Sequence, residues 1–263
     1  MQGGVHLLSG LVLASFGKKE GFKVSAAFGA IFPDIDIFIA ALAYLFIGEK
    51  ATILHRTFTH SLFFITVLSL LIYLLGFITK KYIPDKKISK IDFRSISIGI
   101  GVGMITHVIL DMFYLVKVAV FWPFSLTFVG WPLVTELQLS DLSLKILQTT
   151  DFMTDIFFFI LPLTIISFQQ DKCKNFRKPL IAYIVIDLLF ATFFIFVAFF
   201  IPLSYNDFLI YLYYPGTFFL LFSIFSPLMF KEVIKEFKFE NYTLAIIISM
   251  FIFSQLLFGL FLL

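Results

Sequence analysis

The stretch GMITHVILDMFY, residues 103–114, places one imidazole and one carboxylate inside a long apolar run. His107 and Asp111 are four residues apart, so an α-helix would present both on the same face. This spacing is typical of two metal ligands on one helix, and a bound Zn²⁺ or Mn²⁺ would offset the cost of burying the carboxylate. The alternative is a private hydrogen bond between His107 and Asp111 within the helix.

The composition of the chain indicates a membrane protein. Of its 263 residues, 60% are hydrophobic and only 14% are charged, whereas soluble domains carry about 25% charged residues. The net charge of +3 does not predict nucleic-acid binding, because the basic residues lie between apolar runs and not along one face. The single cysteine, Cys173, excludes a disulfide within the chain and a multi-cysteine metal site.

Seven apolar runs are long enough to cross a bilayer, which takes roughly 20 helical residues. A shorter apolar segment, residues 6–17, precedes them and is expected to form a short buried or re-entrant helix. The sequence therefore predicts an all-α polytopic membrane protein with about seven transmembrane helices plus a short N-terminal helix. The predicted spans are residues 24–47, 61–79, 95–120, 152–168, 180–202, 208–230 and 243–263.

The distribution of lysine and arginine predicts the orientation in the cell (inner) membrane. Both residues 80–94 and residues 169–179 are rich in these side chains, so we expect the two linkers to be cytoplasmic. Alternation along the chain then places residues 231–242 in the cytoplasm as well, and residues 48–60 and 121–151 outside.

The segment PDID, residues 33–36, puts two carboxylates inside the first predicted span. An uncompensated carboxylate there costs roughly 3 kcal/mol. Pro33 is expected to break the helix and to start a new one, which would let Asp34 and Asp36 approach one site near a helix N-terminus. The simpler alternative is that one carboxylate caps the broken helix and the other pairs with a lysine.

The segment HRTFTHS, residues 55–61, stands at the outer end of the next predicted span. His60 is placed as a metal ligand or general base at a water-accessible rim, while His55 is equally well explained as an interfacial residue. Arg56 adds a permanent positive charge and a planar set of hydrogen-bond donors beside the predicted cation site, so we expect an anion to bind between Arg56 and that site.

Five blocks in this order resemble the YdjM-type family of inner-membrane, metal-dependent hydrolases: His6, PDID at 33–36, HRTFTHS at 55–61, THVILD at 106–111 and WPFS at 122–125. The resemblance covers about residues 1–125 and implies a multi-pass membrane protein with hydrolase activity. The His-x-x-x-Asp element is also similar, more distantly, to one in zinc-dependent phospholipase C and P1-type nucleases, which implies phosphoester chemistry. Those enzymes have further His and Glu ligands downstream, whereas this chain has no histidine after His107.

The rest of the chain offers fewer candidates. We expect residues 1–125 to form a metal-dependent hydrolase-like membrane domain, residues 126–151 an outer interfacial loop, and residues 152–263 transmembrane helices whose role the sequence does not indicate. Asp187 lies within an apolar run and is expected to make a structural hydrogen bond.

Together these features predict a membrane-embedded, metal-dependent hydrolase that acts on a phosphoester or a similar polar ester, with a membrane lipid or another small anionic or lipid-like ester as substrate. Arg56 would hold the anionic oxygens, His55 would protonate the leaving group, and His60 is a further candidate base. The alternatives are a divalent-cation transporter, which a fixed charge at Arg56 disfavours, and a non-catalytic membrane protein with a structural metal. One or two divalent ions, Zn²⁺ or otherwise Mn²⁺, would activate a water and would be held by His6, Asp34, Asp36, His60, His107 and Asp111.

Overall fold

The computed structural model describes residues 3–83, 86–114, 117–131, 138–216, 221–240, 242–243, 247, 250–251 and 254–255. Within these residues the regular elements are all helical, and the β-type pairing is one antiparallel bridge between Val118 and Val129. The helices of the first half are α1 (Gly3–Phe16), α2 (Glu20–Gly29), η1 (Phe32–Asp34), α3 (Ile35–Ile47), η2 (Gly48–Leu54), η3 (Phe58–His60), α4 (Leu62–Tyr82), α5 (Lys86–Ser89) and α6 (Phe93–Asp111). Those of the second half are α8 (Asp141–Asp155), the π-helix η4 (Ile156–Ile160), α9 (Leu161–Gln169), η5 (Asp171–Phe176), α10 (Arg177–Phe200), α11 (Tyr205–Asp207), the π-helix η6 (Phe208–Tyr213), α12 (Tyr214–Gly216), α13 (Leu221–Met229) and α14 (Lys231–Lys235).

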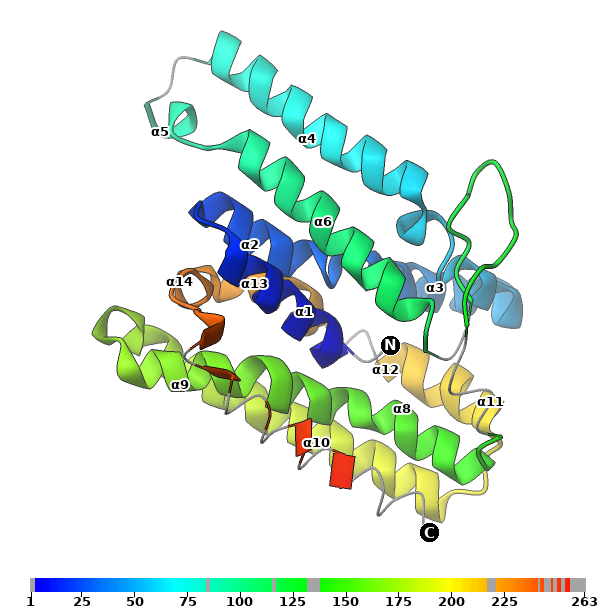
Figure 1. The fold of residues 1–263 in the computed structure, drawn as a ribbon. Coiled ribbons are helices and arrows are strands. Elements are labelled where there is room, and N and C mark those ends of the chain that lie inside the picture. The colour runs from blue at the N-terminus through cyan, green and yellow to red at the C-terminus, as the bar shows by residue number, and fades with distance from the viewer. Residues whose placement is uncertain are drawn as a thin grey trace.

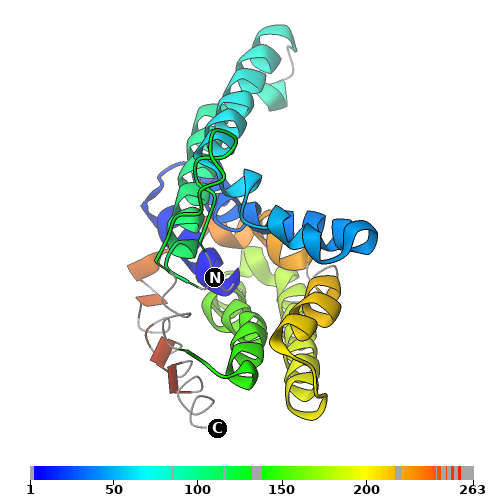
Figure 2. The same ribbon diagram turned by 90° about the vertical axis from the view of Figure 1, so that its right-hand side faces the viewer.

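Two antiparallel helical pairs flank a short central helix (Figure 1). Helices α4 and α6 form one pair, and α10 packs along the continuous rod of α8, η4 and α9 to form the other. Helix α1 lies between the pairs and contacts α6, α8 and η4. Figure 2 shows α4 leaning away from the rest of the molecule. Only 11% of the most apolar stretch of α4 is buried by the rest of the chain, against 50% for α6. Most of α4 is therefore available to lipid.

Four helices are long and apolar enough to cross a membrane, and a bent pair adds a fifth crossing if it counts as one. The all-α, multi-pass architecture is thus confirmed, but about seven spans is too many for the residues that the structure describes. Of the predicted span at 208–230, the structure describes η6, α12 and α13 but not residues 217–220, so this span is not counted among the crossings of the described residues. The predicted span at 243–263 lies mostly outside the described residues. The crossings are Leu62–Tyr82, Phe93–Asp111, Asp141–Gln169, Asp171–Phe200 and the pair Glu20–Gly29 with Phe32–Ala51, bent by 44°.

Two predicted boundaries are also wrong. Helix α6 ends at Asp111 and does not continue to residue 120, because the following chain folds back and the Trp131 amide donates to the Met112 carbonyl over 2.7 Å. Residues 141–151, expected in an outer loop, belong to α8. Its start is fixed by the Ser140 hydroxyl, which accepts a hydrogen bond from the Ser143 amide.

The break predicted at Pro33 is confirmed. Helix α2 ends at Gly29, the proline lies in η1, and α3 begins at Ile35. Asp36 therefore lies in the first turn of α3, with Asp34 immediately before that helix.

Glycines allow α2 and α6 to pack with their backbones in contact. A Cβ on Gly103 would lie 2.4 Å from the Ala26 carbonyl oxygen, and one on Gly29 would lie 2.5 Å from that of Ile100. No other residue fits at such distances. This approach brings the Ala30 carbonyl against the face of α6 that carries His107.

Ion pairs gather the basic segments at one end of the bundle, which we call the basic end. Lys19 pairs with Asp92 at the start of α6, Lys235 pairs with Glu20 over 2.9 Å, and Lys172 pairs with Glu236 over 2.6 Å. The linkers that the sequence predicts to lie on the same side of the membrane are thus close to one another in the structure. The opposite end holds the junctions after α3, before α4 and after α6.

Candidate metal centre

Polar residues from five segments converge at the end of α4 and α6 opposite the basic end. The side chains come from α1, the η1–α3 break, the turn before η3, η3 itself and the last turns of α6. The most buried members have no exposed surface, and the least buried are His55, Asp34 and Arg56, with 14%, 12% and 9% of their side chains exposed. The cluster is therefore approached from the side of these three residues. Its fully buried members are His6, Asp36, His60, His107 and Asp111.

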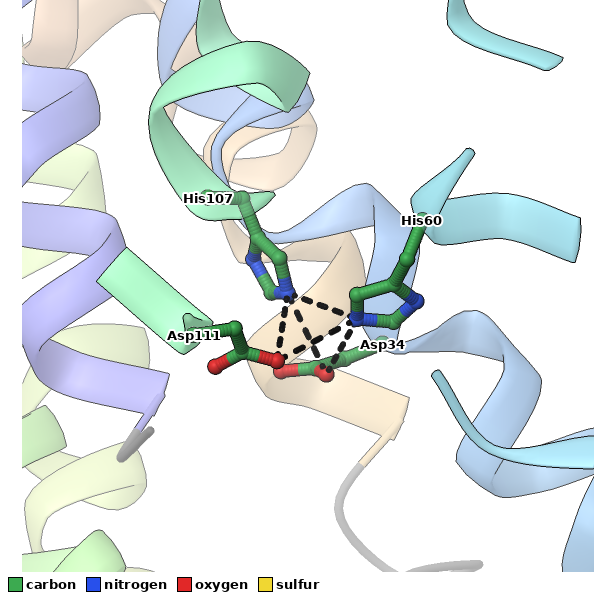
Figure 3. A group of neighbouring side chains, drawn as sticks. All are labelled: Asp34, His60, His107 and Asp111. Atoms are coloured by element: carbon green, nitrogen blue, oxygen red, sulfur yellow. Dashed lines mark hydrogen bonds and ion pairs between the residues drawn. The ribbon is translucent and has the colours of Figure 1, made fainter. Parts of the chain in front are cut away.

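Four of these residues form a compact group that could hold one metal ion: Asp34, His60, His107 and Asp111 (Figure 3). The two Nε2 atoms of His60 and His107 are 3.1 Å apart. His60 Nε2 lies 3.4 Å from Asp111 Oδ2 and 3.8 Å from Asp34 Oδ1, and the corresponding distances for His107 Nε2 are 3.7 and 3.4 Å. Ligands about 2.0–2.1 Å from a tetrahedral ion are separated by about 3.3 Å. The four donor atoms therefore have the size of a tetrahedral coordination shell.

The other ring nitrogens fix the tautomers of the two histidines. His107 Nδ1 lies 2.7 Å from the Ala30 carbonyl oxygen, and His60 Nδ1 lies 3.0 Å from Asp36 Oδ2. Both partners accept hydrogen bonds, so we assign the proton of each neutral ring to Nδ1. The lone pairs of the two Nε2 atoms then face each other across 3.1 Å, an arrangement that needs a cation or a proton between them.

Asp36 organises the cluster from behind the histidines. Its Oδ2 atom accepts hydrogen bonds from the Arg56 amide over 2.9 Å and from the Thr59 hydroxyl over 2.7 Å, in addition to His60 Nδ1. Its Oδ1 atom lies 2.7 Å from His55 Nδ1. Asp36 thus orients His55 and His60 and is not part of the four-residue group. It belongs instead to a smaller group of potential ligands formed with Asp34 and His55.

His6, also predicted as a ligand, lies beside the four-residue group and not within it. Its Nε2 atom is 3.2 Å from Asp111 Oδ1, and its ring stacks on that of His107 with 3.7 Å between centroids. The two oxygens of a carboxylate point apart, so His6 meets the oxygen of Asp111 that faces away from His60 and His107. In this geometry His6 supports a potential ligand from outside.

Arg56 is held in a strained backbone conformation next to the group. Its φ angle of 66° lies in the left-handed region, which non-glycine residues seldom occupy. Its amide donates to Asp36, and its carbonyl accepts from the Ala119 amide over 3.1 Å. Its Nε atom lies 3.3 Å from both Asp111 Oδ2 and His55 Nε2. Strain maintained by surrounding contacts is a common property of functional sites.

The loop at residues 117–131 covers this end of the cluster. Besides its bond to Arg56, it binds the start of α4, where the Leu62 amide donates to the Val120 carbonyl over 3.0 Å. Trp122 packs edgewise against Phe58 and Phe63. The WPFS block at 122–125 therefore has a structural role in this region.

Two contributors to the cluster were missed in the sequence. Thr59 precedes His60 in a run that contains another threonine, and nothing distinguishes it as a partner of Asp36. The Ala30 carbonyl belongs to the backbone, and its contact with His107 depends on the packing of α2 against α6. By contrast, all eight residues that the sequence predicts for metal binding or catalysis are brought together in this one region: His6, Asp34, Asp36, His55, Arg56, His60, His107 and Asp111.

Comparisons with known proteins identify the family. The chain is 35% identical over 126 residues to the uncharacterized protein YvsG of Bacillus subtilis (strain 168), and the match covers 42% of this chain and 66% of YvsG, just under two thirds of that relative. No solved structure matches the chain. The model of the YdjM inner membrane protein family matches residues 1–201, which extends the resemblance seen in the first 125 residues through α8, α9 and α10. The chain belongs to the YdjM inner membrane protein family.

Proposed function

We propose that this protein is a membrane-embedded, metal-dependent hydrolase whose ion is held by Asp34, His60, His107 and Asp111. The observation that carries the proposal is the near-tetrahedral spacing of two Nε2 atoms and two carboxylate oxygens, with both Nδ1 atoms already bound to acceptors. A set of two nitrogens and two oxygens suits Zn²⁺, and Mn²⁺ is the alternative. A second ion would use Asp34 together with Asp36 and His55.

When bound, such an ion would act as a Lewis acid and would lower the pKa of a water molecule toward 7. The chain supplies the remaining functions. Asp36 keeps His55 and His60 in fixed orientations through its contacts with both Nδ1 atoms. His55 is the most exposed of the histidines, so it is placed to protonate a leaving group.

Arg56 supports a phosphoester or a similar anionic ester as substrate. Its guanidinium is permanently charged and lies within 3.3 Å of Asp111, a member of the metal-binding group. A substrate that combines an anionic head with a reactive ester would contact both the ion and this cation. Because the rest of the chain leaves most of the apolar helix α4 uncovered, a membrane lipid is the preferred source of that ester.

The principal competing function is transport of a divalent cation. A buried site of histidines and carboxylates suits either activity, but a fixed positive charge beside the site repels a moving cation and attracts phosphate. The position of Arg56 therefore favours hydrolysis. A purely structural metal would require neither Arg56 nor the exposed edge of His55.

The test measures ester hydrolysis and divalent-ion flux in the same proteoliposomes for the wild type, Arg56→Lys and Arg56→Ala. A hydrolase should lose about 2–4 kcal/mol of transition-state stabilisation in kcat/KM with alanine, and lysine should recover only part of it, because it keeps the charge but not the fork. Bound metal should not fall in either variant, since alanine leaves the site more negative and lysine leaves its charge unchanged. Arg177→Ala, at the start of α10, is the matched control.

Two results would reject the hydrolase. One is ion flux that persists or increases in Arg56→Ala with no ester hydrolysis by any variant, which identifies a transporter. The other is metal-free protein that remains folded and equally active, which removes the ion from the chemistry.

We further propose that the basic end faces the cytoplasm, as the positive-inside rule predicts. Cys173 is buried, so it is a poor probe and should be replaced by serine. A cysteine at Lys174, exposed at the basic end, should then react with an impermeant thiol reagent only in inverted vesicles. A cysteine at Phe124, which is 82% exposed in the loop over the cluster, should react in intact cells, and the reverse pattern would invert the orientation.

A further inference from the structure

A second group of buried polar residues lies in the C-terminal half, away from the candidate metal centre. Asp155 ends α8 and Asp187 lies in the middle of α10; they are 4% and 0% exposed. We call them the carboxylate pair. Helix α10, which carries Asp187, packs against α8 and against η4, which begins directly after Asp155. Both carboxylates belong to helices that can span the membrane.

Hydroxyl groups connect the pair to α13. The Ser223 hydroxyl donates a hydrogen bond to Asp155 Oδ2, and the Tyr183 hydroxyl donates to Ser223 over 2.8 Å. Tyr183 precedes Asp187 by four residues, so both occupy the same face of α10. This face is therefore directed toward the oxygen atoms of Asp155 and Ser223.

The two carboxylates are unequally satisfied. Asp155 Oδ1 faces the first turn of α1, since a Cβ on Gly3 would lie 2.9 Å from it, and the positive end of that helix favours a negative charge. Asp187 has less support, because neither of its oxygens has a hydrogen-bond partner among the described residues, whereas only Oδ1 of Asp155 lacks one. Among the described residues, no lysine, arginine or histidine forms an ion pair with either carboxylate. The prediction that Asp187 makes a structural hydrogen bond is therefore wrong.

A proton alone does not solve this problem. A proton on one oxygen of Asp187 would remove the charge, but the second buried oxygen would still lack a donor among the described residues, which is unfavourable. A metal cation can contact both oxygens and balance the charge as well. The donors gathered here are carboxylate and hydroxyl oxygens, which suit hard cations and not the softer transition metals.

We infer that the carboxylate pair and the Ser223 hydroxyl form a second cation site, selective for a hard, oxygen-binding cation such as Na⁺ or Ca²⁺. The π-helix η4 begins directly after Asp155, and such irregular turns release backbone carbonyls from regular helical bonding and often occur at functional sites. The site differs from the candidate metal centre in composition, because it contains no imidazole. It is independent of the proposed hydrolase activity.

The experiment uses the purified full-length chain, saturated with zinc and exchanged into choline chloride. NaCl or CaCl₂ is added at constant ionic strength, and bound ²²Na⁺ or ⁴⁵Ca²⁺ is counted by equilibrium dialysis beside the melting temperature. The wild type should bind one ion of one kind, and saturation at 100 times the Kd should raise Tm by roughly 5 °C. The two radioactive ions distinguish sodium from calcium.

Three variants complete the test. Asp187→Asn should weaken ion binding at least tenfold and remove the shift in Tm, whereas Asp171→Asn, on the exposed surface, should behave as the wild type. If Asp187→Asn does not fold, Ser223→Ala should still lower the affinity. Zinc content reports whether the first centre is intact. Absence of sodium and calcium binding in the wild type, or binding unchanged in Asp187→Asn and Ser223→Ala, would overturn the inference.

Discussion

The candidate metal centre and the carboxylate pair are two different ways of placing negative charge inside a membrane protein. The first surrounds its three carboxylates with four imidazoles and a guanidinium, and its central carboxylate, Asp36, has partners on both oxygens. The second has only hydroxyl partners, and Asp187 has none among the described residues. The first is therefore organised before any ion binds, whereas the second depends more strongly on a ligand.

The largest effect should be the loss of zinc affinity when a ligand of the candidate metal centre is removed, compared with a mutation in the carboxylate pair. His107→Ala removes one of four donor atoms, so the affinity for zinc should fall by at least 100-fold, more than the 10–100-fold typical of a supporting residue. Asp187→Asn should leave zinc binding unchanged. Metal analysis of the two purified variants makes the comparison, and equal zinc loss in both would mean that the sites are one unit.

This contrast also shows how far the sequence predicts the site. The spacing of His107 and Asp111, the PDID segment and HRTFTHS identify residues whose chemistry is unusual in apolar runs, and the structure brings them together. Their order around the centre depends on rotamers and on contacts between segments, so Asp36 and His6 could not be distinguished from Asp34. Asp187 shows the limit, because its missing partners become visible only when α8, α10 and α13 are packed.

In the fold, too, some features follow from local sequence rules and others depend on tertiary packing. The break at Pro33 and the span beginning after Ser61 follow from local rules, namely a proline at a helix start and a serine N-cap. The bounds of other spans do not, since α6 ends at Asp111 although the apolar run continues to residue 120, and α8 begins at Asp141, before the predicted start at residue 152. Composition sets whether a segment prefers lipid, but the path of the chain is decided by packing and by turns, such as the one in which the Trp131 amide donates to the Met112 carbonyl after α6.

Asp36→Asn should sharpen the comparison, because it weakens the hydrogen bonds that orient the metal-binding residues while keeping the size of the side chain. The amide is a weaker acceptor for His60 Nδ1 and the Thr59 hydroxyl, so metal affinity should fall about 10–100-fold. Thr59→Val is the matched variant, because it deletes one donor to the same oxygen and should cost only about 1–3 kcal/mol of stability. Zinc titration and thermal unfolding measure both. Wild-type affinity in Asp36→Asn would contradict a supporting role.

Gly103→Ala tests whether close helix packing positions His107. The new methyl group would meet backbone atoms of Ala26 and Ala30 at 2.4–2.7 Å, so we expect a loss of about 1–3 kcal/mol in the free energy of unfolding together with weaker zinc binding. Gly101→Ala is the control on the same helix, since its methyl group would meet only the Ser69 side chain, which can move. Equal effects of the two variants would show that the α2–α6 contact has no special role.

The smallest effect on stability is expected at the basic end, far from both sites, where the charged side chains form ion pairs at the surface. The Lys19 ammonium, together with the Ser95 amide and hydroxyl, holds the pKa of Asp92 below its usual value. A depressed folded-state pKa stabilises the protein above the unfolded value of about 3.9, and this contribution disappears as the pH falls through the lower folded-state value. The stability difference between the wild type and Asp92→Asn should therefore be constant from pH 7 to about 5 and should shrink below pH 4.

Because the pair is exposed, added salt should reduce the part of this stability difference that is due to Lys19 but not the part that is due to the N-cap hydrogen bonds of Asp92. Thermal unfolding of the wild type, Lys19→Ala and Asp92→Asn at several pH values and salt concentrations makes the measurement. A difference that grows toward acid pH would mean that Asp92 is destabilised by its surroundings, and the basic end would then need another explanation for its compact packing.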